Sequence, residues 1–393
     1  MNSAEELPGG NGAYELQMKL RTTTVRLLRK KMFDKAIHVL EDGAQRLLDM
    51  KEEGSACDIT EYLLDVYTQA DVKMDDENRK RIISILSRTT SPTWRRKSIA
   101  AASKWAVKAT GNSLGDPQLN ALLSKLLTQD NQWFEAEKHL IGAAGYDEEY
   151  ASDLANMLLD WNAAYSKALA ESNDNEPPTD SVERVLSGTF ALRGWIPLML
   201  VEKPQSALAF IQAYVKSATE RHPSLLLPVK PNPREYKSPS SVSNFTTAIY
   251  MTASPPLNFS QNAVALVCDI QSTKAPVSNE MKAAWQSLLR QFVQDGGLTG
   301  MESLVDLLSE VSSKYIDLHP ARKQTDMLSS MVSKMMGVQS EPQGASANAQ
   351  IKIKQLPRPA APKLKAASDK QSTTSSTAPA VSEADQLVDE EMD

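Results

Sequence analysis

The stretch that decides the fold is WFEAEKHL at residues 133–140, because its pattern occurs twice more in the chain. Residues 33–40 read FDKAIHVL, and residues 206–211 read SALAFI. In each stretch an alanine is followed four residues later by a large aliphatic side chain, so both lie on one face of a helix, where the small alanine lets a neighbouring helix approach closely. The three alanines are 100 and 71 residues apart, close to three and two units of the roughly 34-residue helical hairpin of tetratricopeptide arrays. We therefore predict an all-α fold, an α-solenoid of tetratricopeptide-like hairpins, with a generic helical bundle as the alternative.

Composition and charge limit the classes of function. The chain has 393 residues and a formal net charge of −6, so its overall charge does not favour nucleic acid or an anionic membrane surface as a partner. Its two cysteines, Cys57 and Cys268, lie far apart and without the spacing of a metal-binding or redox pair. No apolar run approaches the roughly 18 residues of a membrane span. We therefore expect a cytosolic (cytoplasmic) binding protein that does not insert directly into membranes.

Composition also divides the chain into four parts. A polar leader at 1–13, expected to be disordered, precedes an N-terminal helical-repeat half at 14–170 and a C-terminal half at 171–337. The remainder, 338–393, is rich in Ser, Ala, Pro, Gln and Lys. Such a composition cannot bury enough apolar surface to fold alone, so we predict a disordered tail.

A proline-rich stretch at about 223–256 interrupts the helical rhythm. Three leucines at 225–227 lie on one side of it, and FTTAIYM at 245–251, on the other side, is rich in the β-branched and aromatic residues that favour strands. We predict a β-hairpin insertion with these two segments as its sides and the prolines in a long tip. An isolated hairpin is marginally stable in water, so this one should lean on a helix or on a partner.

The sequence offers no motif for catalysis. The four histidines are dispersed and form no pair of metal ligands; they are His38, His139, His222 and His319. The chain has neither a phosphate-binding loop ending in Gly-Lys nor a GxSxG nucleophile elbow. Glu135 and Glu137, with His139, do not make an active site by themselves. We expect no enzyme activity, no metal and no cofactor.

Two charged surfaces point instead to binding. The first predicted helix carries a group of basic side chains, which are Arg21, Arg26, Arg29, Lys30 and Lys31. Acidic residues recur at i, i+3 and i+7 on a later predicted helix, as Asp58, Glu61 and Asp65, and this spacing keeps them on one face. A basic and an acidic helix close together would orient a charged partner and speed its association. Ordinary solvated helix faces are the alternative interpretation.

Four stretches, taken in order, resemble a known family. They are LRT at 20–22 with Arg26 and Arg29; Asp58 with YLLDVY at 62–67 and VKMDD at 72–76; GDP at 115–117 through SKLL at 124–127 to EAE at 135–137; and LNF at 257–259. The ordered set, over roughly 14–337, is similar to the Golgi to ER traffic protein 4 family, the helical-repeat scaffold of the guided-entry pathway for tail-anchored proteins. The longer insertion at 228–239 and the tail depart from that family's pattern.

The resemblance implies a cytosolic adaptor without catalytic activity or cofactor. Its N-terminal half would dock on the dimeric ATPase that targets tail-anchored proteins and would restrain ATP hydrolysis. Its C-terminal half would hold a ubiquitin-like-domain protein, which in turn recruits a tetratricopeptide co-chaperone. The site residues that the resemblance implies are Arg21, Arg26 and Arg29 as a basic anchor, Asp58 and Asp65 as an acidic regulatory pair, and Ile249, Tyr250, Leu257 and Phe259 at the groove for the ubiquitin-like partner.

Two other classes of protein share parts of this pattern. A proteasome-lid or signalosome-like solenoid subunit would have similar repeats, but such subunits end in a winged-helix module, which the sequence at 301–337 does not indicate. An enzyme with a helical toroid fold would need acids or histidines that converge on one face. The adaptor is therefore the preferred hypothesis.

Overall fold

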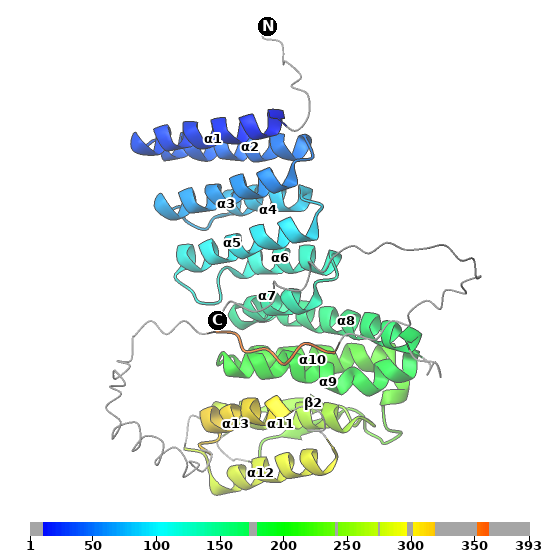
Figure 1. The fold of residues 1–393 in the computed structure, drawn as a ribbon. Helices are drawn as coiled ribbons and strands as arrows, with labels where there is room; N and C mark the ends of the chain where they lie inside the picture. Colours follow the sequence, from blue (N-terminus) through cyan, green and yellow to red (C-terminus); the bar gives the residue numbers. More distant parts are fainter. Residues whose placement is uncertain are drawn as a thin grey trace, which may run out of the picture.

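The structure is a computed structural model that describes residues 11–172, 179–239, 243–273, 276–296, 302–318 and 352–360 (Figure 1). Within these residues, helices dominate, which confirms the predicted helical solenoid. The α-helices are α1 (Asn11–Arg29), α2 (Phe33–Asp49), α3 (Glu53–Gln69), α4 (Asp76–Arg88), α5 (Pro92–Thr110), α6 (Pro117–Gln129), α7 (Trp133–Tyr146), α8 (Ala151–Ser172), α9 (Thr179–Leu200), α10 (Pro204–Arg221), α11 (Pro255–Thr273), α12 (Asn279–Gln294) and α13 (Glu302–Tyr315). Short 3-10 turns, η1 (Glu148–Tyr150) and η2 (Pro223–Leu225), precede α8 and follow α10.

The helices stack into an elongated column, with α1 and α2 at one end and α12 at the other (Figure 1). α1 packs on α2 and α3, and α3 packs on α5, so odd-numbered helices line one side of the N-terminal part. The buried apolar residues form two clusters, one reaching Ala136 and the other beginning at Leu140. The first cluster therefore ends and the second cluster begins within α7. The predicted division between 170 and 171 falls in the last turn of α8, which packs against α9 within the cluster that begins at Leu140.

Polar caps fix several helix starts. The Asp75 side chain accepts from the Asn78 amide at 2.8 Å and begins α4. Asp116 does the same for α6 through the Leu119 amide at 2.6 Å, with a proline at the first helical position. Arg79 of α4 also donates to both carboxylate oxygens of Asp116, at 3.0 and 3.1 Å. The cap of α6 is therefore also a bridge between two neighbouring helices.

A tight joint recurs between consecutive helices. At Lys31, Asn131 and Glu202 the backbone enters the left-handed region, with φ of 56°, 57° and 63°. In each case the amide of the next residue donates to the carbonyl five residues earlier, at 3.0, 2.8 and 2.9 Å. This is the Schellman pattern, which satisfies the last carbonyls of one helix just before the next helix begins. The following helices, α2, α7 and α10, start within two residues of the turn.

The alanine pattern is buried as predicted, but the repeat count is wrong. Ala36, Ala136 and Ala207 are all fully buried, and the aliphatic residue four positions after each is buried as well. They lie on α2, α7 and α10, which are five and three helices apart. Units made of helix pairs would require even numbers. The shared pattern therefore marks the same Schellman joint, and it does not mark the same place in a hairpin repeat.

The predicted β-hairpin is present, with a different first strand. Strand β1 (Arg234–Lys237) pairs antiparallel with β2 (Thr246–Ile249), in the register Arg234 opposite Ile249. The leucines at 225–227 contribute only an isolated bridge, Leu226 opposite Thr252. The prolines at 228, 231 and 233 explain this difference, because proline has no amide to donate and the ladder can begin only after the last of them.

The hairpin leans on the neighbouring helices. The Tyr236 hydroxyl donates to a carboxylate oxygen of Asp269 on α11 at 2.8 Å. On the other strand, Gln212 of α10 donates to the Thr247 hydroxyl at 2.7 Å. The hairpin is thus tied to the second cluster, as expected for a pair of strands that is marginal alone.

Part of the predicted disordered tail is packed on the solenoid. Residues 352–360 form an extended segment, called the strap below, whose Leu356 is only 3% exposed. The composition argument considers the tail alone, whereas here the helices supply the apolar cluster in which Leu356 is buried. The first ten residues of the predicted leader and the rest of 338–393 lie outside the described residues.

The described helices were compared in length and apolar character with the roughly 20 residues that a membrane-spanning helix needs. None of them combines the length and the apolar character that crossing a bilayer requires.

Candidate functional site

The predicted basic and acidic residues meet on the face made by α1, α3 and α5. Gln17 links α1 to α3, because its amide nitrogen donates to Asp58 at 3.2 Å and its amide oxygen accepts from Ser55 at 3.1 Å. The Arg21 guanidinium lies over the Tyr62 ring, 5.9 Å from its centroid. Cation–π contacts of this kind hold a charged group in place while leaving it open to solvent.

The basic anchor is exposed on α1. Arg21, Arg26 and Arg29 all have exposed side chains. Arg26 and Arg29 lie in the last turn of the helix, where cations complement the helix dipole. The helix dipole therefore accounts in part for the presence of Arg26 and Arg29 at this end of α1, whether or not a partner docks there.

The acidic residues differ in their environment. Lys97 of α5 donates to Asp58 at 3.3 Å and to Glu61 at 3.2 Å. The hydrogen bond to Glu61 raises the pKa of Lys97, and the one to Asp58 adds to that rise. Asp65 is exposed at the far end of the row, about 10 Å from Asp58 along the helix axis by the rise of seven residues. The negative charge is therefore least compensated at Asp65.

Sequence reasoning missed Lys97 and the aromatic residue beneath it. The Lys97 ammonium lies 5.9 Å from the Trp94 ring, which is itself partly exposed. Both residues lie on α5, almost 40 residues after Asp58, and only the stacking of α3 on α5 brings them together. No local pattern in the sequence signals that contact.

The four residues predicted to form the groove for a ubiquitin-like partner divide into surface and core. Ile249 and Tyr250 are half-buried at the end of β2. The side chain of Gln261 on α11 fixes Tyr250, since it accepts from the Tyr250 amide at 2.8 Å and donates to its carbonyl at 3.0 Å. Leu257 and Phe259, on α11, are 0% and 3% exposed. Of the four, Ile249 and Tyr250 are the ones at the surface.

Phe259 supports this region from within. Its ring stacks on Phe292 of α12 with centroids 4.0 Å apart and planes within 10°. A cavity of about 380 Å³ lies beside the pair and also touches Leu227, Thr252 and Leu288. The base of the hairpin, α11 and α12 therefore enclose a small hollow with an aromatic wall.

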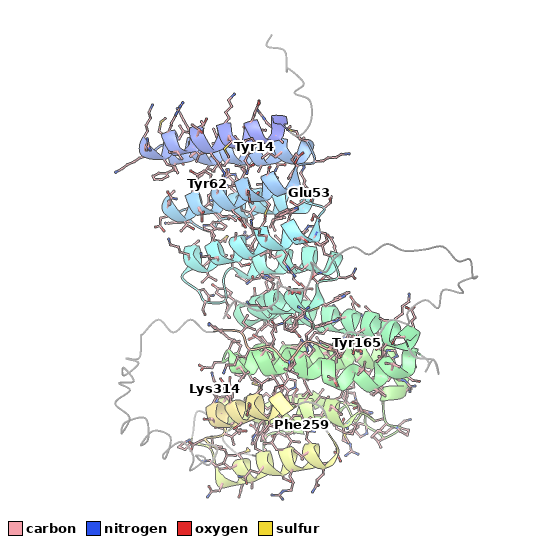
Figure 2. The ribbon with its side chains drawn as sticks, viewed as in Figure 1. Tyr14, Glu53, Tyr62, Tyr165, Phe259 and Lys314 are labelled. Atoms are coloured by element: carbon pink, nitrogen blue, oxygen red, sulfur yellow. The ribbon has the colours of Figure 1, made fainter. Side chains whose placement is uncertain are left out.

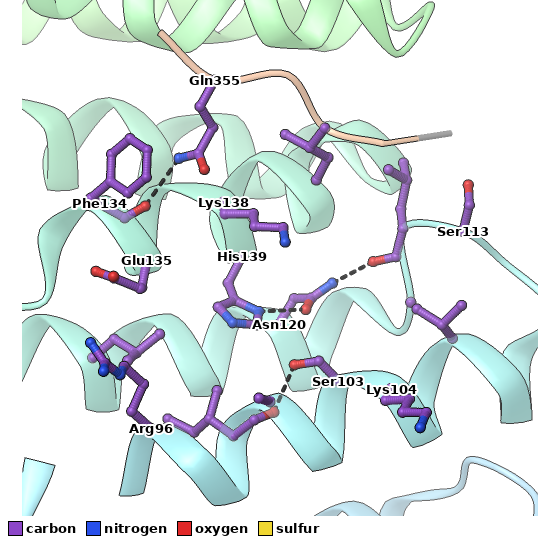
Figure 3. Close-up of a pocket in the computed structure, with 17 residues that line it drawn as sticks. Arg96, Ser103, Lys104, Ser113, Asn120, Phe134, Glu135, Lys138, His139 and Gln355 are labelled. Atoms are coloured by element: carbon purple, nitrogen blue, oxygen red, sulfur yellow. Dashed lines mark hydrogen bonds between the residues drawn. The ribbon is translucent and has the colours of Figure 1, made fainter. Parts of the chain in front are cut away.

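A larger hollow of about 520 Å³ lies between α5, α6 and α7 (Figure 3). His139 lies in its wall, with its Nδ1 atom 3.0 Å from Oδ1 of Asn120. The Asn120 amide nitrogen donates to the Leu114 carbonyl at 2.7 Å, so Oδ1 is the acceptor and His139 carries its proton on Nδ1. Burial lowers the pKa of His139 to about 4, and the charge of Lys138 acts in the same direction.

We expect His139 to make stability depend on pH. The unfolded chain takes up a proton below about pH 6.5 whereas the folded chain does not until about pH 4, so His139 lowers stability as the pH falls through that window and has no such effect above it. His139→Gln should therefore lose less stability between pH 7 and pH 5 than the native chain. Urea unfolding at the two pH values measures the difference, and equal losses would contradict the assignment.

A buried ion pair lies next to this hollow. Arg193 of α9 donates to both carboxylate oxygens of Glu137 at 2.7 and 2.8 Å, and the two side chains are 3% and 0% exposed. Burial raises the pKa of Glu137, and the guanidinium opposes that rise. The guanidinium also lies over the Trp161 ring, 4.6 Å from its centroid. Sequence reasoning named Glu137 but could not identify its partner, which is 56 residues away.

The described residues contain no group of three or more His, Cys, Asp or Glu side chains placed to hold a metal ion. Cys57 and Cys268 are both buried and free. Burial raises the pKa of the Cys268 thiol to about 12, helped by the charge of Asp269.

Comparison with known proteins agrees with this architecture. The family model of Golgi to ER traffic protein 4 matches residues 30–336. The Golgi to ER traffic protein 4 of Aspergillus fumigatus is 25% identical over 354 residues, which cover 85% of this chain and 90% of that protein. The homolog from Dictyostelium discoideum is 23% identical over 181 residues, 46% of this chain and about half (54%) of that protein.

A solved structure shares the fold. The crystal structure of C. therm. Get4 superposes with a TM-score of 0.61 at 18% identity, covering 90% of this chain and 95% of that one. At this identity the likeness supports the fold alone, whereas the family model covers most of the chain. The chain therefore belongs to the Golgi to ER traffic protein 4 family.

Proposed function

We propose that this chain is an adaptor that bridges a targeting ATPase and a ubiquitin-like-domain protein, and so promotes the transfer of tail-anchored membrane proteins toward the ER. Family membership supports the pathway. One structural observation supports the bridging role: Tyr62, on the charged α1, α3 and α5 face, and Phe259, beneath the hairpin surface, lie toward opposite ends of the column (Figure 2). A scaffold that holds two partners at its ends raises the concentration of one near the other without any new contact between them.

The charged face would act on the ATPase in two ways. The exposed cations Arg21, Arg26 and Arg29 would attract an acidic surface, which speeds association and makes it sensitive to salt. Asp58 and Asp65 would restrain hydrolysis by binding one conformation of the ATPase better than another, because only a difference in affinity shifts an equilibrium. Lys97 compensates Asp58 in part, so Asp65 would carry the larger share of this effect.

Reversing both acids should separate docking from regulation. We expect Asp58→Lys/Asp65→Lys to bind the ATPase nearly as well as the native chain, since the basic anchor remains, and to lose the restraint on hydrolysis. Steady-state ATPase assays and a binding titration, both with purified proteins, measure the two effects.

The matched control is Glu149→Lys/Asp153→Lys, which makes the same change in net charge at exposed positions of η1 and α8. The control should leave hydrolysis as restrained as with the native chain. Undiminished restraint by the Asp58→Lys/Asp65→Lys variant would reject the regulatory assignment.

A further inference from the structure

The strap, residues 352–360, crosses the solenoid as an extended segment, drawn in orange in Figure 1. Its contacts come from helices far away in the sequence. Lys354 reaches Glu310 of α13 at one end, and the Ala360 carbonyl accepts from the Tyr165 hydroxyl of α8 at 2.9 Å at the other. Between these ends it lies against α7 and α9. We call the surface under it the strap groove.

The centre of the strap groove binds the backbone of the strap through hydrogen bonds to its carbonyls. Arg193, itself almost fully buried, donates from Nη1 to the Pro357 carbonyl at 2.7 Å and from Nη2 to the Leu356 carbonyl at 3.4 Å. Glu137 holds the guanidinium in this orientation. Charge-assisted donors aimed at consecutive carbonyls hold an extended chain firmly, and the buried Leu356 side chain anchors it in the hydrophobic cluster.

A glutamine adds selectivity beside this anchor. The Gln355 amide nitrogen donates to the Phe134 carbonyl at 3.0 Å, as Figure 3 shows, and also to a carboxylate oxygen of Glu137. Gln355 therefore adds a hydrogen bond to two acceptors of α7, one of which, the Glu137 carboxylate, also binds Arg193. A hydrocarbon side chain at that position would lose both of these bonds.

Two cations flank the anchor and match acids of the groove. Lys354 pairs with Glu310 at 2.6 Å, and Arg358 pairs with Glu135 at 2.9 Å. The Arg358 guanidinium also lies over the Phe134 ring, 4.9 Å from its centroid. The strap therefore carries a basic, an apolar and a second basic group in sequence, and the groove places an acidic, an apolar and a second acidic group opposite them.

Proline suits this mode of binding. Pro357 and Pro359 have no amide hydrogen, and the strap is held through its carbonyls and side chains. The prolines also restrict the backbone to extended conformations, so less conformational freedom is lost on docking.

We infer that the strap groove is a peptide-binding site for extended, basic, proline-containing segments with a leucine anchor, and that residues 352–360 are its own ligand, docked in cis and releasable. The flanking ion pairs are weak individually, since Lys354 and Arg358 are both more than half exposed. Attachment to the same chain compensates for this weakness, because a tethered ligand acts at an effective concentration of roughly millimolar. This inference does not depend on the adaptor role.

Release of the strap would change a second feature. Ile353 and Gln355 form part of the wall of the 520 Å³ hollow, together with His139, Lys138 and Arg96. With the strap displaced, this hollow would become continuous with the empty groove, and Glu135 and Glu137 would lose their hydrogen bonds to Arg358 and Gln355.

Competition between the strap and a free peptide tests the inference. The probe is a fluorescein-labelled synthetic peptide with the sequence of residues 350–362, and the proteins are full chains. We expect the peptide to bind the Leu356→Asp/Arg358→Asp chain at least about tenfold more tightly than the native chain, because only the native strap competes for the groove. Fluorescence anisotropy measures both affinities, and unchanged circular dichroism shows that the variant is folded.

A charge swap supplies the control. In the Leu356→Asp/Arg358→Asp chain, whose strap is released, a further Glu135→Arg change should weaken binding of the native peptide. A peptide carrying Arg358→Glu should bind that triple variant with the original affinity. This recovery requires residue 358 of the peptide to lie against residue 135, as in the docked strap. Non-specific binding of a basic peptide would not produce it. Equal affinity of the native and released chains, absence of peptide binding to the released chain, or failure of the swap would each overturn the inference.

Discussion

Glu137→Ala is expected to lower the free energy of unfolding by about 3–5 kcal/mol, because it leaves the buried Arg193 guanidinium without its carboxylate. The pair is almost inaccessible to water, so solvent cannot replace the two lost hydrogen bonds. The same change removes the group that orients Arg193 toward the strap. Urea denaturation followed by tryptophan fluorescence measures the loss, since Trp161 lies against the guanidinium.

The double variant Glu137→Leu/Arg193→Met is the matched control. It removes both charges while keeping comparable volume, and replacing a buried ion pair in this way is often close to neutral. We expect it to recover most of the stability that Glu137→Ala loses, while the strap, which needs the Arg193 donors, stays released. A loss below about 1 kcal/mol in Glu137→Ala would show that the pair is far better solvated than its burial indicates.

Phe259→Asp is expected to have an effect of similar size nearer the α12 end of the column. It removes the ring stacked on Phe292 and places an unpaired carboxylate in the second cluster. Truncation of a buried phenylalanine alone costs about 3–5 kcal/mol, and the buried charge adds to this cost. Thermal unfolding should show a large drop in the melting temperature of the C-terminal part.

Tyr250→Asp separates partner binding from folding. Tyr250 is half-buried at the surface of the hairpin, so we expect its substitution to cost below about 1 kcal/mol. If the hairpin surface holds the ubiquitin-like partner, Tyr250→Asp should weaken that complex in calorimetric titration while the melting temperature changes little. Phe259→Asp should lose both stability and partner. A Phe259→Asp chain with native stability would contradict its place in the core.

The sequence predicted which face of a helix is buried better than it predicted the number of helices between two similar patterns. The spacing of Ala136 and Leu140 is enough to predict a buried face, because the relation is local to one helix. Counting helices between two such patterns requires the length of every helix and joint between them, and these vary from 13 residues in α4 and α6 to 22 in α8 and α9. The interval of 100 residues between Ala36 and Ala136 therefore matched three hairpin units by length, although the two alanines lie five helices apart.

Contacts between distant segments explain the remaining differences. Arg234–Lys237 has little strand character in a proline-rich stretch, and it becomes a strand because Tyr236 is held by Asp269 on α11. Leu356 lies in a polar tail with few large apolar residues, and it is buried only because it packs into the cluster that begins at Leu140. For the site, Arg21 and Asp58 could be placed on helix faces from their spacing, but the compensating Lys97 could not.

The position of the strap also bears on how the chain is made. The strap groove is complete once α13 has been synthesised, and residues 352–360 follow it. A ribosome adds roughly 5–20 residues each second, so the groove waits empty for a few seconds on every nascent chain. Neighbouring ribosomes on one messenger RNA carry copies at adjacent stages, and a strap released from one copy fits the open groove of the next. An exchange of the strap between two copies would be a form of domain swapping, in which each groove holds the same segment of the other chain.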